Sequence, residues 1–399
     1  MQYRQVPKNG DKLSALGFGA MRLATKRMSI DEERATRQIR SAIDNGVNYI
    51  DTAVPYHGGE SERFLGRALQ EGYREKVKLA TKLPPWSVKT RNDMDRILEI
   101  QLKKLQTDHI DYYLLHGLEA GHWKRLLEFG VLEFLDSAKA AGKITNAGFS
   151  FHGDRKTFKE IIDTYDWIFC QIQYNFLDET NQAGTEGLRY AAAKNIAVMV
   201  MEPLRGGMLA GKLPADVEQV YREAGTKQSA AAWALRWVWN HPEVTVVLSR
   251  MNDEAHIAEN LKTCEEALPG SMTADDLATV EKVAATYRKL IKVGCTGCAY
   301  CMPCPFGVNI PQCFSMYNDY SMGLNRMMTR GFYGMQLMGG MAVPADASLC
   351  RDCGKCVKAC PQKIAIPEEL KKVRSTLGGL RTKLMLPLVR LMFSQKVKE

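Results

Sequence analysis

The sequence has 399 residues, 45% hydrophobic and 25% charged, which is enough apolar material for a core of normal size and excludes a disordered or fibrous protein. The net charge of +9 lies mostly at the C-terminus, because residues 371–399 contain eight lysines and arginines against one glutamate, a net +7. The body of the chain is therefore not expected to bind nucleic acid. The longest strongly apolar run, 384–393, has only ten residues, so we expect no membrane span and a cytoplasmic location.

Strand and helix patterns alternate through the first 270 residues. Before the first strand, the segment around Asn9-Gly10 is predicted to form a hairpin that plugs the bottom of the fold. Ser29 with Glu32 predicts a capping box at the start of the first helix, and Asn45-Gly46 predicts its end. Eight apolar runs are predicted to be strands: 16–19, 47–51, 77–82, 110–116, 144–150, 168–174, 196–202 and 244–249.

The connections between these strands read as amphipathic helices, among them 94–105 and 230–239. Such alternation implies parallel strands joined by right-handed crossovers. Eight strand–helix units in roughly 250 residues favour a closed (β/α)8 TIM barrel over an open sheet.

Four polar residues stand where reactive side chains of such a barrel are found, at the C-terminal ends of strands. Asp51, Lys82 and His116 each end a predicted strand, and Tyr56 follows Asp51 in the next loop. A phenol donates protons poorly near neutral pH unless a neighbouring ammonium stabilises its phenolate, which is the role expected of Lys82, with Asp51 keeping the lysine charged. His116 is expected to align a substrate oxygen. The set suits protonation of a carbonyl oxygen; the alternative is four unrelated polar residues at loop entrances.

Together with the motifs around them, these residues make the sequence resemble the aldo-keto reductases over roughly residues 1–270. The similarity lies in LGFGAMRL, GVNYIDTAVPYHGGESERFLGRAL, LATK, DYYLLH, GKITNAGFSFH, QIQYN and AHIAENL. The resemblance implies that Asp51, Tyr56, Lys82 and His116 form the family's catalytic tetrad, with Tyr56 as general acid/base. It also implies a nicotinamide cofactor bound across the barrel mouth without a Rossmann fold.

The resemblance further implies five cofactor contacts: Ser150 and Gln171 at the carboxamide, Glu259 and Asn260 near the adenine, and Arg250 at a phosphate. Three positions depart from the family pattern. Phe151 replaces a usual asparagine, Met201 a tyrosine that stacks on the nicotinamide, and His256 an arginine that meets the 2′-phosphate. Because Arg250 remains, NADP(H) is favoured over NAD(H).

A second constellation consists of cysteines, nine of which fall between residues 295 and 360. They follow CxxCxxC and then CxxCxxCxxxCP, the ligand run of bacterial ferredoxins, whose fourth cysteine reaches the other cluster. The pattern assigns one 4Fe-4S cluster to Cys295, Cys298, Cys301 and Cys360, and another to Cys350, Cys353, Cys356 and Cys304. The spacing from Cys301 to Cys304 is shorter than the pattern requires, so the number of clusters, one or two, stays undecided. Cys313 is a spare cysteine that could replace a ligand. Zinc held by four thiolates is the alternative.

These patterns divide the chain into four parts: an aldo-keto reductase barrel (1–270), a linker helix (271–294) opened by a Thr273/Asp276 cap, a ferredoxin-type domain (295–366) and a basic tail (367–399). The ferredoxin-type part contains a methionine-rich insert, 314–347, interpreted as core packing rather than a docking surface. The tail carries leucines at helical spacing, which fits either packing on its own domain or an amphipathic membrane anchor.

Two functional hypotheses follow. The first is an NAD(P)H-dependent carbonyl reductase that acts on a small aldehyde or ketone and carries one or two 4Fe-4S clusters. The alternative is an iron–sulfur electron-transfer protein whose barrel docks a redox partner or another organic cofactor. A redox partner protein and peripheral membrane contact through the tail are further hypotheses. Direct electron transfer between the nicotinamide and the clusters is difficult, because nicotinamide gives two electrons as hydride whereas each cluster passes one.

Overall fold

The computed structural model describes residues 1–27, 29–211, 213–225, 227–295, 301–322, 326–340, 343–360, 364–380, 382, 384, 386 and 387. The chain divides into two compact units, one containing Met1–Gly211 and Lys227–Val280, the other Lys212–Thr226 and Glu281–Lys396. Cys298, Arg381, Lys383 and the end of the predicted tail from 388 lie outside the described residues.

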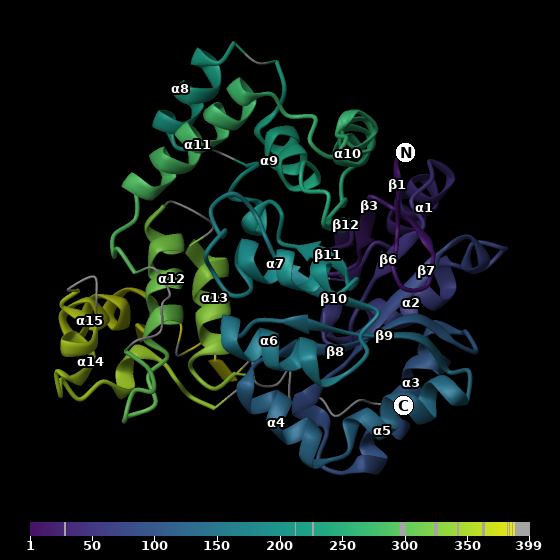
Figure 1. Ribbon diagram of the computed structural model, residues 1–399, viewed down its shortest axis with the longest axis horizontal. Coiled ribbons are helices and arrows are strands. Elements are labelled where there is room, and N and C mark those ends of the chain that lie inside the picture. The colour runs from purple at the N-terminus through teal and green to yellow at the C-terminus, as the bar shows by residue number, and fades with distance from the viewer. Residues whose placement is uncertain are drawn as a thin grey trace. The chain divides into compact units, whose positions relative to one another are not determined.

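The first unit is built on a closed barrel of eight parallel strands, as predicted. Its strand order is β10-β11-β12-β3-β6-β7-β8-β9, and Figure 1 shows the helices outside it. The strands are β3 (Leu16–Gly19), β6 (Tyr49–Asp51), β7 (Lys78–Leu83), β8 (Ile110–Leu118), β9 (Ile144–Phe151), β10 (Phe169–Gln173), β11 (Ala197–Met201) and β12 (Val244–Ser249). Each matches one predicted run. The β6–β7 pairing sets Asp51 opposite Ala80, two residues before Lys82.

The described helices of this unit are α1 (Glu32–Asp44), α2 (Ser61–Ala68), α3 (Arg91–Leu105), α4 (Ala120–Glu128), α5 (Val131–Ala140), α6 (Arg155–Thr164), α7 (Gly184–Ala193), α9 (Ala230–Trp239) and α10 (Glu254–Glu266). The predicted Ser29/Glu32 capping box is wrong. Ser29 belongs to β5 (Ser29–Ile30), which pairs with β4 (Thr25–Lys26), so its backbone is extended and engaged elsewhere. Asp31 caps α1 instead, and its carboxylate accepts from the Arg34 N–H at 3.3 Å.

The N-terminal hairpin is confirmed. β1 (Tyr3–Gln5) pairs antiparallel with β2 (Lys12–Ser14), and Gly10 in the turn has a φ of 79°, which favours glycine. Val6 and Leu13 are fully buried in the cluster that contains Tyr49, Tyr112 and inward residues of other strands. The hairpin therefore closes one end of the barrel interior with apolar side chains.

The second unit contains α8 (Ala215–Glu223), α12 (Ile310–Ser321), α13 (Arg326–Gln336), α14 (Lys355–Ala359) and α15 (Ile366–Leu377). α11 (Ala274–Lys289) crosses the division between the units and begins at the predicted cap, where Thr273 and Asp276 exchange two hydrogen bonds of 3.1 Å. The core of this unit is formed by side chains of α12, α13 and α15, including Phe314, Tyr333 and Leu370.

The methionine-rich insert contributes to this core, in agreement with the packing interpretation: Met316, Met322 and Met338 are buried, whereas Met327 is 69% exposed. Met341 lies outside the described residues. Where the tail is described, Leu377 is buried within the unit and Leu380 is 73% exposed. No described helix has both the length and the apolar composition needed to cross a membrane.

Candidate functional site

The centre of the candidate site is a buried ion pair between neighbouring strands. The Lys82 Nζ on β7 lies 2.7 Å from both carboxylate oxygens of Asp51 on β6, and it donates to the Thr52 carbonyl at 2.8 Å. The two side chains are only 1% and 3% exposed. Burial lowers the pKa of Lys82 and raises the pKa of Asp51, while their mutual attraction opposes both shifts. Each partner is thus what keeps the other charged.

Tyr56 and His116 lie beside this pair at the C-terminal end of the strands. The Lys82 Nζ is 5.2 Å from the centroid of the Tyr56 ring, and the rings of Tyr56 and His116 meet edge to face at 6.3 Å. Tyr56 follows β6 and is partly exposed; His57, next to it, accepts a 2.9 Å hydrogen bond from the Leu23 N–H that ties the loop down. The structure therefore brings the four predicted residues together.

The electrostatics of Tyr56 differ from the expectation that Lys82 stabilises a phenolate. The Lys82 ammonium is surrounded by the two Asp51 oxygens and the Thr52 carbonyl. Removal from water, and then the carboxylates of Asp51 and Glu202, raise the pKa of Tyr56 well above its usual value. The phenol consequently keeps its proton at neutral pH.

His116 is held neutral. Removal from water, followed by the positive charge of Lys82, lowers its pKa well below 6.5. Its Nδ1 is buried and has no hydrogen-bond partner among the described residues. Trp86 packs 5.2 Å from the His116 ring and 6.3 Å from that of His122, so aromatic rings form one wall of the site. A neutral imidazole with unused hydrogen-bonding capacity can orient a polar ligand atom.

Two of the predicted cofactor residues occupy adjacent strands. Ser150 on β9 pairs in register with Gln171 on β10, and its hydroxyl oxygen accepts from the Gly117 N–H at 2.7 Å. The Gln171 Nε2 is 3.5 Å from the Met201 sulfur, while its buried Oε1 has no partner among the described residues. An unsatisfied buried amide oxygen is costly, so it requires a donor from a ligand or water.

The other predicted cofactor residues follow β12 or lie on α10. The Asn260 Nδ2 donates to the Ser249 hydroxyl at 2.9 Å, so this buried amide is engaged within the protein. Glu259 and Arg250 are partly exposed. His152, after β9, is exposed, with its Nδ1 3.3 Å from the Gln182 Oε1.

Sequence reasoning missed Arg22. Its pKa is lowered by burial and then by the nearby guanidinium of Arg250, so two arginines from the ends of β3 and β12 gather here. The signal was present in the LGFGAMRL motif, which contains this arginine, but the contact with a residue 228 positions later is tertiary.

A buried polar network behind the ion pair was also missed. Glu62 on α2 is fully buried, and its Oε1 accepts from the Thr81 hydroxyl at 2.7 Å and the Gln101 amide at 2.9 Å. The same Gln101 amide donates to the Lys82 carbonyl at 2.9 Å. Burial raises the pKa of Glu62. The network fixes β7 at the position that carries Lys82.

The described cysteines of the ferredoxin-type segment lie in the second unit. Cys295, Cys301, Cys304, Cys350, Cys356 and Cys360 pack against its core, and Cys353 is exposed. Burial raises the pKa of the Cys350 thiol, with the Asp352 carboxylate and the Cys304 thiol acting in the same direction. Burial likewise raises the pKa of Cys356, and Cys350 and Cys353 add to it. Within this predicted ligand set, Cys304 thus adds to the raised pKa of Cys350, and Cys350 and Cys353 add to that of Cys356.

The spare cysteine, Cys313, is fully buried, with its sulfur 3.9 Å from the Tyr333 hydroxyl and the Ala345 carbonyl. Burial raises the pKa of its thiol to about 12. In the part of the chain that the structure describes, no group of three or more cysteine, histidine or acidic side chains is arranged to hold a metal ion. The ligand sets therefore remain predictions, and Cys298 lies outside that part.

Comparisons with known proteins agree with this architecture. Residues 15–284 match the Aldo/keto reductase family and residues 294–365 the 4Fe-4S dicluster domain. The uncharacterized oxidoreductase YrpG of Bacillus subtilis is 28% identical over 67% of this chain and 92% of its own length. The methylglyoxal reductase YeaE of Escherichia coli is 27% identical over 71% of this chain and 95% of its own.

Among solved structures, the holo form of aldo-keto reductase AKR11C1 from Bacillus halodurans superposes with a TM-score of 0.60 and 26% identity, covering 71% of this chain and 96% of that one. The family match spans more than half of the sequence and coincides with the barrel, while the cysteine-rich segment has its own match. The chain is therefore a member of the aldo/keto reductase family that carries a C-terminal 4Fe-4S dicluster domain.

Proposed function

We propose that this protein is an NAD(P)H-dependent oxidoreductase that reduces a small aldehyde or ketone, with Tyr56 as proton donor, and that it carries one or two 4Fe-4S clusters. The observation that carries the proposal is the buried Lys82–Asp51 pair beside Tyr56 and His116. Burying two charges costs desolvation free energy. Buried ionisable groups with shifted pKa values are common at functional sites, so a pair of this kind at the mouth of the barrel supports a role toward a bound ligand.

The residues around the mouth fit a nicotinamide cofactor. Gln171 Oε1 is a buried acceptor without a described partner, and a carboxamide N–H₂ is the kind of donor that satisfies it. Arg250 and Arg22 would hold phosphate groups, which favours NADP(H) over NAD(H). When bound, the nicotinamide supplies the hydride.

The protein's own groups then manage the proton and the geometry. Tyr56, which keeps its proton because its pKa is raised, donates that proton to the carbonyl oxygen as negative charge develops there. The Lys82 ammonium lies 5.2 Å from the centroid of the tyrosine ring, but Asp51 neutralises it, so it attracts the remaining phenolate only weakly. His116, neutral because its pKa is lowered, orients the oxygen by a hydrogen bond. Trp86 narrows the mouth beside His116 and limits the substrate's size.

The cysteine chemistry fits iron–sulfur clusters. The ferredoxin spacing that includes Cys304, Cys350, Cys353 and Cys356, together with the match of residues 294–365 to a 4Fe-4S dicluster domain, supports at least one cluster. The other set contains Cys298, outside the described residues, so the number of clusters is decided by an iron count. Anaerobic preparations with about eight irons per chain indicate two clusters and about four indicate one.

The test is carbonyl reduction with NADPH and a reactive aldehyde, compared between Tyr56→Phe and Tyr73→Phe. The control removes the same hydroxyl from a partly exposed tyrosine, Tyr73, which donates to the Asp44 carboxylate at 2.9 Å. We expect Tyr56→Phe to lose at least ~10²-fold in the chemical step and to bind NADPH normally, because only the proton donor is removed. Wild-type turnover in Tyr56→Phe would contradict the proposal.

A further inference from the structure

One surface of the second unit is rich in unpaired positive charge. We call it the Cys353 face and define it by the exposed residues of the segment 351–358 and by the exposed side of α15 formed by Lys371, Arg374 and Ser375. Lys371 Nζ bridges the two parts through a 3.0 Å ion pair with Asp352, the only acidic residue of that segment. The face thus joins the ligand-bearing loop to the helix that follows it.

In the described part of the chain, ion pairs neutralise the acidic residues nearby but leave most cations of the face without an ion pair. Lys371 also contacts Glu368 at 3.3 Å, and Lys372 contacts Glu369 at 2.7 Å. Among the described residues, four exposed cations of the face have no ion pair: Arg351, Lys355, Lys358 and Arg374.

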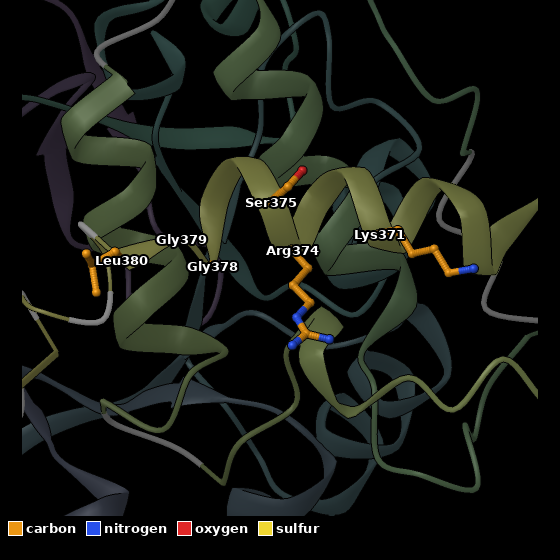
Figure 2. Close-up of a pocket in the computed structure, with 6 residues that line it drawn as sticks. All are labelled: Lys371, Arg374, Ser375, Gly378, Gly379 and Leu380. Atoms are coloured by element: carbon orange, nitrogen blue, oxygen red, sulfur yellow. The ribbon is translucent and has the colours of Figure 1, made fainter.

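The same face exposes a predicted cluster ligand. Cys353 is exposed, whereas the other described cysteines of its set are partly buried, and Val357 of the same segment is 37% exposed. Figure 2 shows Lys371 and Arg374 projecting from α15. With Ser375, Gly378, Gly379 and Leu380 they line a hollow of about 450 Å³. A hollow with cations at its rim fits acidic side chains of a protein partner.

We propose that the Cys353 face docks an acidic one-electron carrier protein, which exchanges electrons with the cluster held by Cys353. The proposal rests on the iron–sulfur part of the proposed function. In the exchange, the carrier loses one electron and the cluster gains one, or the reverse, and no bond forms or breaks. Electron transfer weakens steeply with distance, so an exposed ligand is the point where a carrier's centre comes closest. The surrounding cations attract and orient an acidic partner.

Binding of the full-length, anaerobically prepared protein to an acidic plant-type [2Fe–2S] ferredoxin tests this proposal. The test variant is Lys355→Glu/Arg374→Glu. The matched control, Lys103→Glu/Lys156→Glu, makes the same change of net charge at exposed lysines of the first unit. Dissociation constants are measured by calorimetry at low and high salt, and cluster reduction by reduced ferredoxin is followed by stopped-flow absorbance. The iron count and NADPH-dependent carbonyl reduction are measured on every sample.

We expect at least ~10-fold weaker ferredoxin binding in the test variant and less than ~2-fold in the control, with iron and carbonyl reduction unchanged in both. Wild-type binding should weaken with salt, because the screening length falls from ~10 Å at 0.1 M to ~3 Å at 1 M. Equal weakening in both variants would overturn the proposal, since it would reflect net charge alone. The proposal would also be overturned if the wild type bound anionic lipid vesicles but not ferredoxin, and the test variant no longer bound the vesicles. That result would indicate that the face binds a membrane surface. The iron count decides the cluster assignment separately from docking.

Discussion

Replacing Asp51 with asparagine should destabilise the barrel severely. The change preserves shape but leaves the Lys82 ammonium, 1% exposed, without the carboxylate that lies 2.7 Å away. Removing one partner of a buried pair costs about 3–5 kcal/mol, because the remaining charge stays desolvated. Since domains are stable by only about 5–15 kcal/mol, the variant should be folded but marginal.

A matched control isolates burial as the cause. Asp163 and Lys194 also form a pair at 2.7 Å, but their side chains are 46% and 44% exposed. Asp163→Asn should cost no more than about 1 kcal/mol, because water already solvates both charges. The two substitutions thus compare one chemical change at one distance in two environments.

The assay is urea unfolding followed by tryptophan fluorescence, which reports the barrel because all six tryptophans lie between residues 86 and 239. Lys82→Met and the double variant Asp51→Asn/Lys82→Met complete a thermodynamic cycle, for which we expect a coupling of ~2–3 kcal/mol. A loss below about 1 kcal/mol in Asp51→Asn, or additive effects in the cycle, would show that the two charges do not stabilise each other in the folded barrel.

Three further outcomes are expected. The pKa of His116 is well below 6.5 in the folded protein, so the unfolded state takes up this proton first as the pH falls. The free energy of unfolding of the wild type should therefore decrease below pH 6.5, by up to about 1.36 kcal/mol per pH unit from this group. In His116→Phe, urea unfolding at several pH values should show a correspondingly weaker dependence of the free energy of unfolding on pH. Cys353→Ser and Cys356→Ser should each lose iron and the brown absorbance, and unchanged iron counts in both would disprove the ligand assignment. Cys313→Ala should keep its iron, because the thiol packs in the core beside Tyr333, and should instead lower stability; a loss of iron would make Cys313 a ligand.

Much of the fold could be predicted because its signals are local. Strand 16–19 was predicted to the residue, since a short apolar run bounded by turns is encoded within a few positions. The start of the first helix was predicted wrongly, because Ser29 and Asp31 are both residue types that can cap a helix N-terminus. The β4–β5 pairing, which engages Ser29, decides between them.

Apolar runs of strand length, helical 3.6-residue patterns and cysteine intervals are properties of neighbouring residues, so the barrel, the polar residues at the strand ends and the two cysteine motifs could be recognised before folding. The electrostatics of the site, by contrast, could not be predicted from neighbouring residues. The three acceptors around Lys82, the raised pKa of Tyr56, the approach of Arg22 to Arg250 and the buried hydrogen-bond network of Glu62 all depend on contacts between separate elements of the chain. Burial sets these pKa shifts, and burial exists only once the barrel has closed.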